Sequence, residues 1–274
     1  MPELPEVETL VRDLRAAVVG RRVTAVQLGH PQVLRFPAPE VFSALLPGRR
    51  VEMVTRSGKF ILCGLDGGED LVFHLGMTGH VLVCDAATEP APHTHLRALL
   101  DDGRELRYDD ARRFGRILLG PRSTLESSRV LPMLGVEPLS EDFTTERFDM
   151  VLRSTTRTVK AALLDQRGVA GLGNIYVDEA CHLAGVRPQR RCHTLTRAQR
   201  GALHAAIPAV LLSAISNRGS SIDDYRDLWN ARGSNQERLQ VYGRGGQSCF
   251  RCAAILKQAT VAGRTTVWCP SCQR

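Results

Sequence analysis

Four cysteines near the end of the chain have the spacing of a metal site. Cys249 and Cys252 are separated by two residues, Cys269 and Cys272 likewise, and sixteen residues lie between the two pairs. Two such pairs at the ends of a hairpin bring four thiolates into a tetrahedron, which Zn²⁺ accepts without strain. Because four thiolates leave no open coordination position, the spacing predicts one structural Zn²⁺. Disulfides and a rubredoxin-like iron site are the alternatives.

The segment between the cysteine pairs predicts an arginine at the tip of a hairpin. VAGRTTVW places a tight turn at Ala262-Gly263 and Arg264 directly after it. A unit of about thirty residues with almost no core depends on its metal for folding. Such a unit offers a rigidly held arginine, although a zinc ribbon alone is equally compatible with RNA, DNA or protein as the partner.

The positive charge of the chain is concentrated in this same region. Lys and Arg number 36 against 29 Asp and Glu, for a formal charge of +7. Six of the cations and no acid lie between Arg238 and Arg274, which leaves +1 for the first 237 residues. A basic segment of this kind suits a polyanion, although the excess of Arg over Lys is also compatible with genome base composition.

The amino terminus could supply a nucleophile. Pro2 follows the initiator Met, and removal of that Met exposes a secondary amine. An amino terminus has a pKa of about 7.7–8.0, so an appreciable neutral fraction exists at pH 7. A neutral secondary amine can attack the anomeric carbon of a sugar and form a cationic iminium, which is covalent catalysis. Glu3 and Glu6 follow it, at positions where acids are also expected simply because a helix begins there.

The first 120 residues predict a β-sandwich with one leading helix. Residues 1–20 have apolar residues at helical spacing and end in Gly20. Residues 21–120 then contain short apolar runs, which are broken by Asp66-Gly67-Gly68 and by Asp102-Gly103 as hairpin turns are. We therefore expect an α+β multidomain protein whose N-terminal β-sandwich domain spans residues 1–120.

The second half predicts a linker, a helical domain and the cysteine unit. Residues 121–142 are punctuated by Pro and Ser and are interpreted as a linker. A helical domain is expected over 143–237, with a functional or disordered loop at 217–229, and the zinc unit over 238–274. The expected helices lie at 144–154, 157–166, 174–184 and 196–216, the last with Thr196 as its cap and Pro208 as a kink.

The composition favours a cytoplasmic protein. No segment approaches 18 consecutive apolar residues, and the first twenty residues carry charges where a signal peptide needs an apolar run. In a reducing compartment the eight cysteines are not expected to form four disulfides. Cys63 is expected in the core of a strand.

Several short motifs follow one another along the whole chain. They are MPELPEVET at the start, RSGKF at 56–60, HLGMTG at 74–79, RRFG at 112–115, LLDQ at 163–166, GLGNIY at 171–176, VYGR at 241–244 and the cysteine quartet. In this order they strongly resemble the formamidopyrimidine-DNA glycosylase family of base-excision repair enzymes. Leu4 points to this branch, since the related endonuclease VIII branch usually has Gly there.

The resemblance implies a bifunctional DNA glycosylase and AP lyase that acts as a monomer on damaged double-stranded DNA, with no membrane partner. It implies excision of oxidised purines such as 8-oxoguanine and formamidopyrimidines. Pro2 matches the nucleophile that forms a Schiff base, and Glu3 matches the acid/base, with Glu6 beside it. Lys59 matches the proton donor in β-elimination, and Arg264 matches the residue implicated in δ-elimination and phosphate contact.

The resemblance also implies a set of DNA contacts. Met77, Arg112 and Phe114 match residues that fill the space left by an everted base, a task that suits an adaptable thioether, a bidentate donor and a wedge. Without the motifs, Met77 and Phe114 would be interpreted as core residues. GLGN at 171–174 fits the turn of a helix-two-turn-helix (H2TH), so the helical domain 143–237 is expected to be a helix-two-turn-helix DNA-binding domain. Asn174 matches a phosphate ligand there and is also compatible with a helix cap. The further DNA-contact candidates are His74, His93, Lys160 and Tyr242.

The segment 217–223 departs most from the family. Members often carry a Gly-Gly/Ser/Thr pattern that covers an everted oxidised guanine, whereas this chain has NRGSSID. The departure leaves two alternatives open. One is an endonuclease VIII-like activity on oxidised pyrimidines, and the other is a non-catalytic zinc-ribbon protein that binds DNA.

Overall fold

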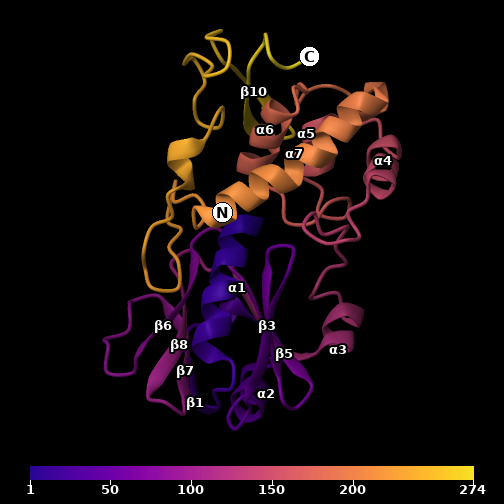
Figure 1. Ribbon diagram of the computed structural model, residues 1–274. Helices are drawn as coiled ribbons and strands as arrows, with labels where there is room; N and C mark the ends of the chain where they lie inside the picture. Colours follow the sequence, from indigo (N-terminus) through magenta and orange to yellow (C-terminus); the bar gives the residue numbers. More distant parts are fainter. The chain divides into compact units, whose positions relative to one another are not determined.

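A computed structural model describes residues 1–274 as two units, each built from two stretches of the chain (Figure 1). Unit 1 comprises residues 1–133 and 217–234, and unit 2 comprises residues 134–216 and 235–274. The expected α+β multidomain class is confirmed. The grouping differs from the expected boundaries, because the zinc unit joins the helices in unit 2 and the loop after the last helix joins unit 1.

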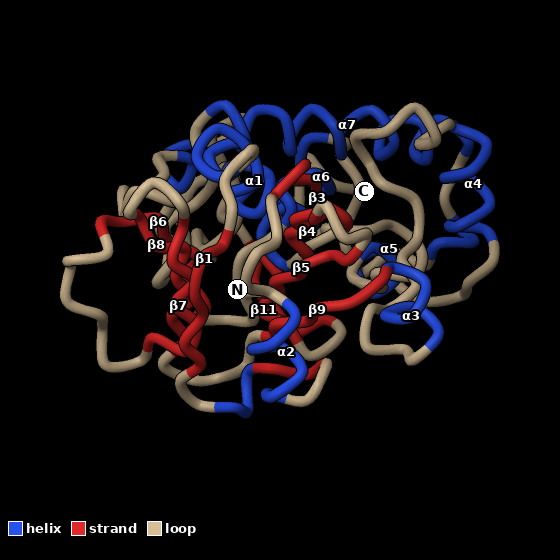
Figure 2. The backbone as a smooth tube through the Cα atoms, turned by 90° about the horizontal axis from the view of Figure 1, so that it is seen from below, coloured by secondary structure: helices blue, strands red, loops and turns tan.

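Two sheets form the frame of unit 1, and Figure 2 shows them as two groups of strands. The four-stranded sheet has the order β1-β7-β8-β6, with β1 Val23–Leu28, β7 Thr94–Leu100, β8 Arg104–Asp110 and β6 Gly79–Asp85. The five-stranded sheet has the order β2-β9-β5-β4-β3, with β2 Leu34–Phe36, β9 Arg116–Pro121, β5 Glu69–His74, β4 Phe60–Leu65 and β3 Val51–Ser57. Neighbouring strands are antiparallel except β2 and β9.

One hydrophobic core joins the two sheets. Alternate residues of several strands enter it, as in Leu71 and Phe73 on β5 and Leu106 and Tyr108 on β8. The rings of Phe73 and Tyr108 stack with their centroids 5.9 Å apart. This arrangement confirms the predicted β-sandwich, and Cys63 lies fully buried within it.

Helix α1 (Leu4–Val18) covers this core with one apolar face. Val7, Leu10, Val11 and Leu14 are at most 1 % exposed. Burial of each such side chain contributes roughly 1.5–3 kcal/mol to the free energy of folding. The helix ends where expected, since Gly20 adopts a φ of 83° that L side chains disfavour. Its first turn thereby fixes the amino terminus against the sandwich.

The turns predicted from Asp-Gly pairs are confirmed. Gly68 and Gly103 have φ values of 85° and 84° in the connections β4–β5 and β7–β8. Unit 1 also contains short helices that the sequence did not predict, one of them inside the expected linker. They are η1 Pro31–Val33, α2 Pro39–Leu45 and α3 Arg122–Ser127.

Residues 217–234 are grouped with unit 1, whereas the sequence analysis placed the loop 217–229 in the helical domain 143–237. Tyr225 and Leu228 are buried in the sandwich core, and the backbone N–H of Ser220 donates to the Glu6 carboxylate of α1. Sequence periodicity could not reveal this, because two apolar anchors within a polar stretch give no periodic signal.

Unit 2 contains the four predicted helices and the hairpin. The helices are α4 Thr145–Arg153, α5 Val159–Leu163, α6 Asn174–Leu183 and α7 Arg197–Ser216, with single turns η2 Cys192–Thr194 and η3 Asn235–Arg238. Thr196 caps α7 as expected, since its hydroxyl accepts from Gln199 N at 3.2 Å. The helix continues past Pro208. No helix of the chain has both the length and the apolar character that crossing a bilayer requires.

The C-terminal hairpin pairs β10 (Lys257–Val261) with β11 (Arg264–Trp268). Ala262 and Gly263 form its two-residue turn with φ values of 51° and 70°, as the sequence predicted. Arg264 follows the turn and is exposed.

Candidate functional site

The amino terminus is built into the start of α1. Pro2 is buried, and Glu3 and Glu6 are only 3 % and 1 % exposed. Glu3 is the N-cap: its carboxylate accepts from the backbone N–H of Glu6, and its own N–H donates to Glu6 Oε2 at 2.8 Å. This capping box holds the two carboxylates beside Pro2. Burial is the condition that Glu3 needs to act as an acid at a helix start.

Lys59 lies in the same unit at the turn between β3 and β4. The preceding Gly58 has a φ of 55°, which makes the two-residue turn possible, and Lys59 is only 7 % exposed. Few lysines are this buried, because desolvating an ammonium is costly. A buried Lys is a suitable proton carrier, since its pKa responds strongly to its surroundings.

His74, predicted as a DNA contact, is neutral at pH 7. Burial, and then the positive charges of Arg116 and Lys59, lower its pKa from 6.5 to about 4. Its Nδ1 accepts a hydrogen bond from Gly76 N at 3.3 Å. His74 therefore shapes the turn that carries Met77 and offers no positive charge to a phosphate.

The three residues predicted to fill the space left by an everted base lie on exposed loops of unit 1. Met77 is 42 % exposed and Phe114 is 53 % exposed, which excludes the alternative that they are core residues. The guanidinium carbon of Arg112 lies 4.6 Å from the centroid of the Phe114 ring. Exposed apolar side chains grouped with an arginine are suited to insertion between bases.

Asp110 holds these two loops together and was missed by the sequence analysis. It is fully buried at the end of β8. Its Oδ1 accepts from the Thr78 hydroxyl at 2.6 Å and from Arg112 N at 3.3 Å, and its Oδ2 accepts from Gly115 N at 2.7 Å. The only sequence signal was an acid directly before the ARRFG motif, a position where a carboxylate can organise a turn.

The loop that carries Arg112 and Phe114 also depends on Gly115. A Cβ at Gly115 would lie 1.7 Å from the hydroxyl oxygen of Tyr108, which is itself fully buried. We expect Gly115→Ala to lower the free energy of unfolding by roughly 1–3 kcal/mol, as overpacking does, and to weaken binding of lesion-containing duplex. Urea unfolding and a binding titration measure both effects.

The matched control for this variant is Gly201→Ala, since Gly201 lies within α7 and a Cβ there would meet no atom within 4 Å. Alanine is favoured over glycine in a helix, so this change is expected to be neutral or stabilising. Equal stability of both variants would contradict the packing described for Gly115.

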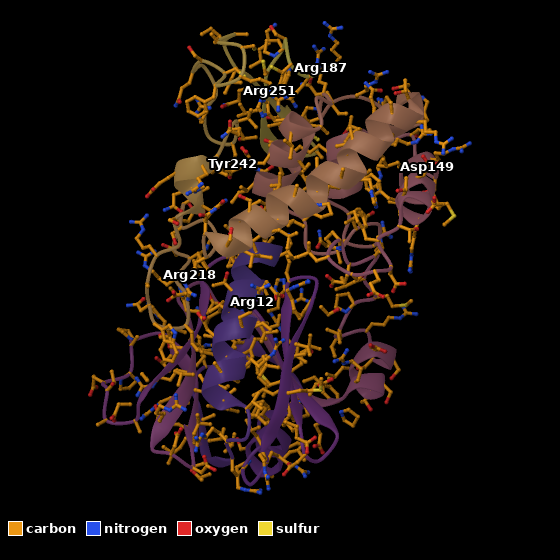
Figure 3. All side chains as sticks on the ribbon, viewed as in Figure 1. Arg12, Asp149, Arg187, Arg218, Tyr242 and Arg251 are labelled. Carbon is orange, nitrogen blue, oxygen red and sulfur yellow. The ribbon has the colours of Figure 1, made fainter.

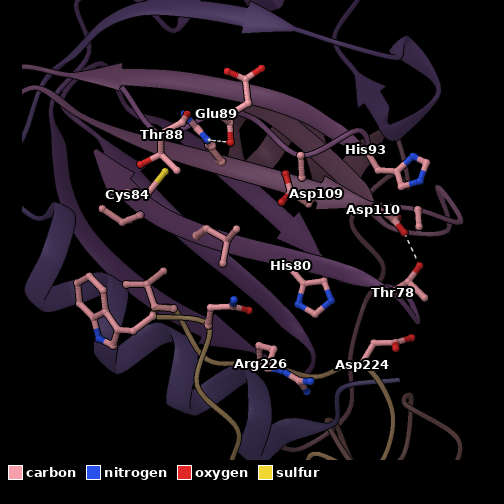
Figure 4. Close-up of a pocket in the computed structure, with 18 residues that line it drawn as sticks. Thr78, His80, Cys84, Thr88, Glu89, His93, Asp109, Asp110, Asp224 and Arg226 are labelled. Carbon is pink, nitrogen blue, oxygen red and sulfur yellow. Dashed lines mark hydrogen bonds between the residues drawn. The ribbon is translucent and has the colours of Figure 1, made fainter. Parts of the chain in front are cut away.

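A cavity of about 770 Å³ adjoins these loops within unit 1 (Figure 4). Residues of β6, β8 and the segment 224–230 line it, among them His80, Asp109 and Arg226. His93, a predicted DNA contact, is exposed at the same end as Thr78 and Asp110, and its carbonyl accepts from Asp110 N at 3.0 Å. Burial lowers the pKa of His80 although Asp109 and Asp224 oppose the change.

Lys160 in unit 2, a predicted DNA contact, is not exposed, as a side chain that contacts DNA must be. It is fully buried, and its Nζ donates to Asp178 Oδ1 at 2.7 Å and to Thr265 O at 3.1 Å. The other oxygen of Asp178 accepts from Val267 N at 3.0 Å. Lys160 and Asp178 thus fasten the hairpin strand β11 to α6 next to Arg264. Burial of the ammonium, which sequence cannot show, explains the difference.

The neighbouring Glu179 holds the segment that contains Tyr242. It is 6 % exposed, and its carboxylate accepts from the backbone N–H groups of Gln240, Val241 and Tyr242 at 2.8, 2.9 and 2.9 Å. Burial raises its pKa, although these three hydrogen bonds act in the opposite direction. Tyr242 itself is half-buried, so part of its ring remains available.

Asn174 begins α6, and Gly173 is the N-cap, so the expectation that Asn174 is itself the cap is wrong. Its Oδ1 is buried without a hydrogen-bond partner. Gln166 shapes the preceding turn, because its side chain accepts from Gly171 N at 2.9 Å and donates to the carbonyls of Leu164 and Leu172. A helix start that carries an Asn side chain is suited to an anion.

The four predicted ligands come together at the base of the hairpin. The Sγ atoms of Cys249, Cys252, Cys269 and Cys272 lie within 4.8 Å of one another. Cys249 and Cys272 are separated by 4.0 Å, and Cys252 and Cys269 by 3.4 Å. A tetrahedron of metal–sulfur bonds of about 2.3 Å requires sulfurs about 3.8 Å apart, so the cluster can bind a metal. His182 Nε2 lies 3.6 Å from Cys249 Sγ.

Comparison with known proteins agrees with this architecture. Residues 1–117 match the family model described as the formamidopyrimidine-DNA glycosylase N-terminal domain, and residues 134–226 match its H2TH domain. The formamidopyrimidine-DNA glycosylase of Chloroflexus aggregans is 46 % identical, over all of this chain and 98 % of the relative. That of Herpetosiphon aurantiacus is 44 % identical, over all of both chains.

Solved structures of similar proteins have the same fold. The MutM (Fpg) protein from Thermus thermophilus has a TM-score of 0.89 at 42 % identity, over 99 % of this chain and 98 % of that one. Lactococcus lactis Fpg in complex with DNA containing an abasic site has a TM-score of 0.92 at 35 % identity, over 99 % of each chain. A MutM complex with DNA containing carbocyclic 8-oxo-G has a TM-score of 0.91 at 34 % identity, over all of both chains. The chain therefore belongs to the formamidopyrimidine-DNA glycosylase family.

Proposed function

We propose that this protein is a bifunctional DNA glycosylase and AP lyase that removes oxidised purines from double-stranded DNA. The observation that carries the proposal is the buried group of Pro2, Glu3 and Glu6 at the start of α1. It combines a latent secondary amine with carboxylates whose positions are fixed by a capping box. Relatives whose titles name DNA with 8-oxo-G or an abasic site support the substrate class.

The first chemical step uses the Pro2 amine after Met1 has been removed. The nitrogen lone pair forms a bond to C1′ of the damaged nucleotide, and the bond from C1′ to the base breaks, so that the base leaves with the electron pair and takes up a proton. The attacking nitrogen loses its own proton, which restores a lone pair on it. Glu3 protonates the ring oxygen of the sugar in the same step, so that the ring opens as the base leaves. The nitrogen lone pair forms the C=N bond of a cationic Schiff base.

Strand cleavage follows from the electron demand of this cation. Loss of a proton from C2′ expels the 3′ phosphate in β-elimination, and Lys59 supplies the proton transfer for this step. A second loss of a proton, from C4′, expels the 5′ phosphate in δ-elimination, which we assign to Arg264. The product is a one-nucleotide gap with a phosphate at each end, and the enzyme is released by hydrolysis of the Schiff base.

The remaining candidates bind DNA. Everting a nucleotide costs a few kcal/mol, and contacts in the space it leaves must offset that cost. We assign this task to the exposed side chains of Met77, Arg112 and Phe114 in unit 1. In unit 2, Asn174 and Tyr242 contact the DNA backbone, as does His93 in unit 1.

The metal of the cysteine cluster is proposed to be Zn²⁺. Four thiolates favour a tetrahedral ion, and the absence of an open position limits it to a structural task. When bound, the ion supplies the cross-link that a hairpin with a small core lacks. The chain's own residues then present Arg264 at the hairpin turn, supported on α6 through Lys160 and Asp178.

An excision assay tests the proposed function. The protein is incubated with a duplex that carries 8-oxoguanine opposite cytosine, and with one that carries an oxidised pyrimidine. We expect the purine duplex to be converted faster, to a gap with phosphates at both ends. Faster conversion of the pyrimidine duplex would assign the protein to endonuclease VIII-like chemistry, and binding without cleavage would leave only a DNA-binding role.

A further inference from the structure

Arg218 has an unusual backbone conformation for an arginine. Its φ is 58°, in the left-handed region that L side chains disfavour, and Gly219 follows with a φ of 78°. Glycine adopts this conformation without penalty. A long side chain persists at such a position when its interactions fix the conformation, so an outlier of this kind points to a task for the side chain.

Arg218 is labelled in Figure 3. Its guanidinium joins two carboxylates that lie far apart in sequence. Its Nη1 and Nη2 donate to the two oxygens of Asp13 on α1, at 3.3 and 2.5 Å. Its Nε and Nη2 donate to Asp227 Oδ2 at 3.0 and 2.6 Å. All three residues belong to unit 1. The fork geometry of arginine allows both pairings at once, which an ammonium cannot reproduce.

Asp227 depends on this cation. It is only 2 % exposed, and its Oδ1 is occupied by the backbone N–H groups of Trp229 and Ala231, at 3.0 and 2.8 Å. These hydrogen bonds shape the turn at residues 227–231. A buried carboxylate that loses its charged partner carries a large desolvation penalty. Removal of Arg218 therefore disturbs the turn as well as its link to α1.

The other part of the same loop is fixed next to the catalytic terminus. Ser220 N donates to Glu6 Oε1 at 2.7 Å, and the Tyr225 hydroxyl donates to the Glu6 carbonyl at 3.3 Å. Glu6 Oε2 in turn accepts from the backbone N–H of Glu3. The loop thus contacts α1 at Glu6, beside Pro2 and Glu3, and again about two turns further along the helix at Asp13.

We propose that Arg218 is a positioning residue that holds residues 217–231 against α1, so that this loop forms the wall beside Pro2 against which a damaged base is held during excision. The inference rests on the proposed function. An abasic site has no base to hold, so its cleavage does not need this wall. Arg218 then acts on the excision of a base and not on the elimination steps.

Single-turnover kinetics on two substrates test this role. Arg218→Ala is expected to slow excision of 8-oxoguanine by about tenfold or more, since displacement of a positioning group by about 1 Å can cost ~10²-fold. Cleavage of a duplex with a preformed abasic site is expected to stay within about twofold of the unaltered protein, a difference too small to reflect loss of the site. Arg218→Lys restores the charge without the fork and is expected to recover only part of the excision rate.

The chain offers a closely matched control. Arg122 pairs with Asp70 in unit 1, and the two side chains are 45 % and 14 % exposed, against 44 % and 13 % for Arg218 and Asp13. Arg122→Ala is expected to leave both rates unchanged. Arg218→Gly serves as the second variant, because it relieves the backbone and removes only the ion pairs, and we expect it to show the same loss of excision.

The outcomes separate the inference from the function on which it rests. Equal losses on both substrates in Arg218→Ala and Arg218→Gly would mean that the ion pairs serve stability alone. Unchanged excision in both variants would remove Arg218 from the reaction. If the unaltered protein cleaves abasic DNA and excises no oxidised purine, the proposed function fails, whatever the variants do.

Discussion

Replacing Cys249 by serine is expected to unfold the C-terminal hairpin and abolish cleavage of lesion-containing DNA. The buried cluster around this hairpin contains only Val241, Cys249, Leu256, Val267 and Cys269, of which two are themselves metal ligands. Binding of a structural Zn²⁺ contributes about 10–16 kcal/mol in small zinc units, and that free energy is folding free energy. Loss of one thiolate removes most of it, and with it the rigid presentation of Arg264.

Metal content and limited proteolysis measure this effect directly. The variant is expected to lose its zinc and to be cut within residues 245–274, while unit 1 stays folded. Cys84→Ser is the control, because Cys84 is a half-buried residue of β6 outside the cysteine cluster. A Cys249→Ser protein that retained one Zn²⁺ and resisted proteolysis would contradict the assigned ligand set.

Replacing Glu3 by glutamine is expected to slow base excision by about 10²–10⁴-fold, the usual contribution of a positioned proton donor. Glutamine has nearly the same shape as glutamate. The hydrogen bond from the backbone N–H of residue 3 to the Glu6 carboxylate is unaltered, and the new amide oxygen can still accept from the backbone N–H of Glu6, so both hydrogen bonds of the capping box persist. The fold of α1 is therefore expected to persist. Single-turnover excision with a matched circular dichroism spectrum is the measurement.

Glu40→Gln is the corresponding control, since Glu40 is the acid in the first turn of α2 and is exposed. It removes one carboxylate from a helix start of the same kind without altering the amino terminus. We expect its excision rate to equal that of the unaltered protein. If Glu3→Gln also retained the full rate, Glu3 would not be the proton donor.

Local signals in the sequence were sufficient to predict most of the helices, the hairpin turns and the metal site. The CxxC pairs, the Ala262-Gly263 turn and the Asp-Gly hairpins each depend on residues close together in the chain, and each is present in the structure. The spacing of apolar residues likewise placed α1 and the helices of unit 2. Such features are encoded within one element, so their prediction does not require knowledge of the fold.

Features that depend on distant partners could not be predicted in this way. A lysine such as Lys160 is normally expected at the surface, and only its ion pair with Asp178 explains its burial. Asp110 is one of two adjacent acids, and only the fold shows that it joins two loops. The loop 217–234 lacks periodicity and is placed by Arg218, Tyr225 and Leu228, whose partners lie about 200 residues earlier or within the sandwich.

Borohydride trapping tests the central claim, that the Pro2 amine forms the covalent intermediate. Borohydride reduces a Schiff base to a stable amine, so the intact protein mixed with 8-oxoguanine duplex is expected to give a one-to-one covalent adduct. Peptide mass spectrometry is expected to place the adduct on Pro2, and Pro2→Gly with an unperturbed fold is expected to give much less of it. An adduct on Lys59, an equal yield from Pro2→Gly, or no adduct from an active protein would contradict the mechanism.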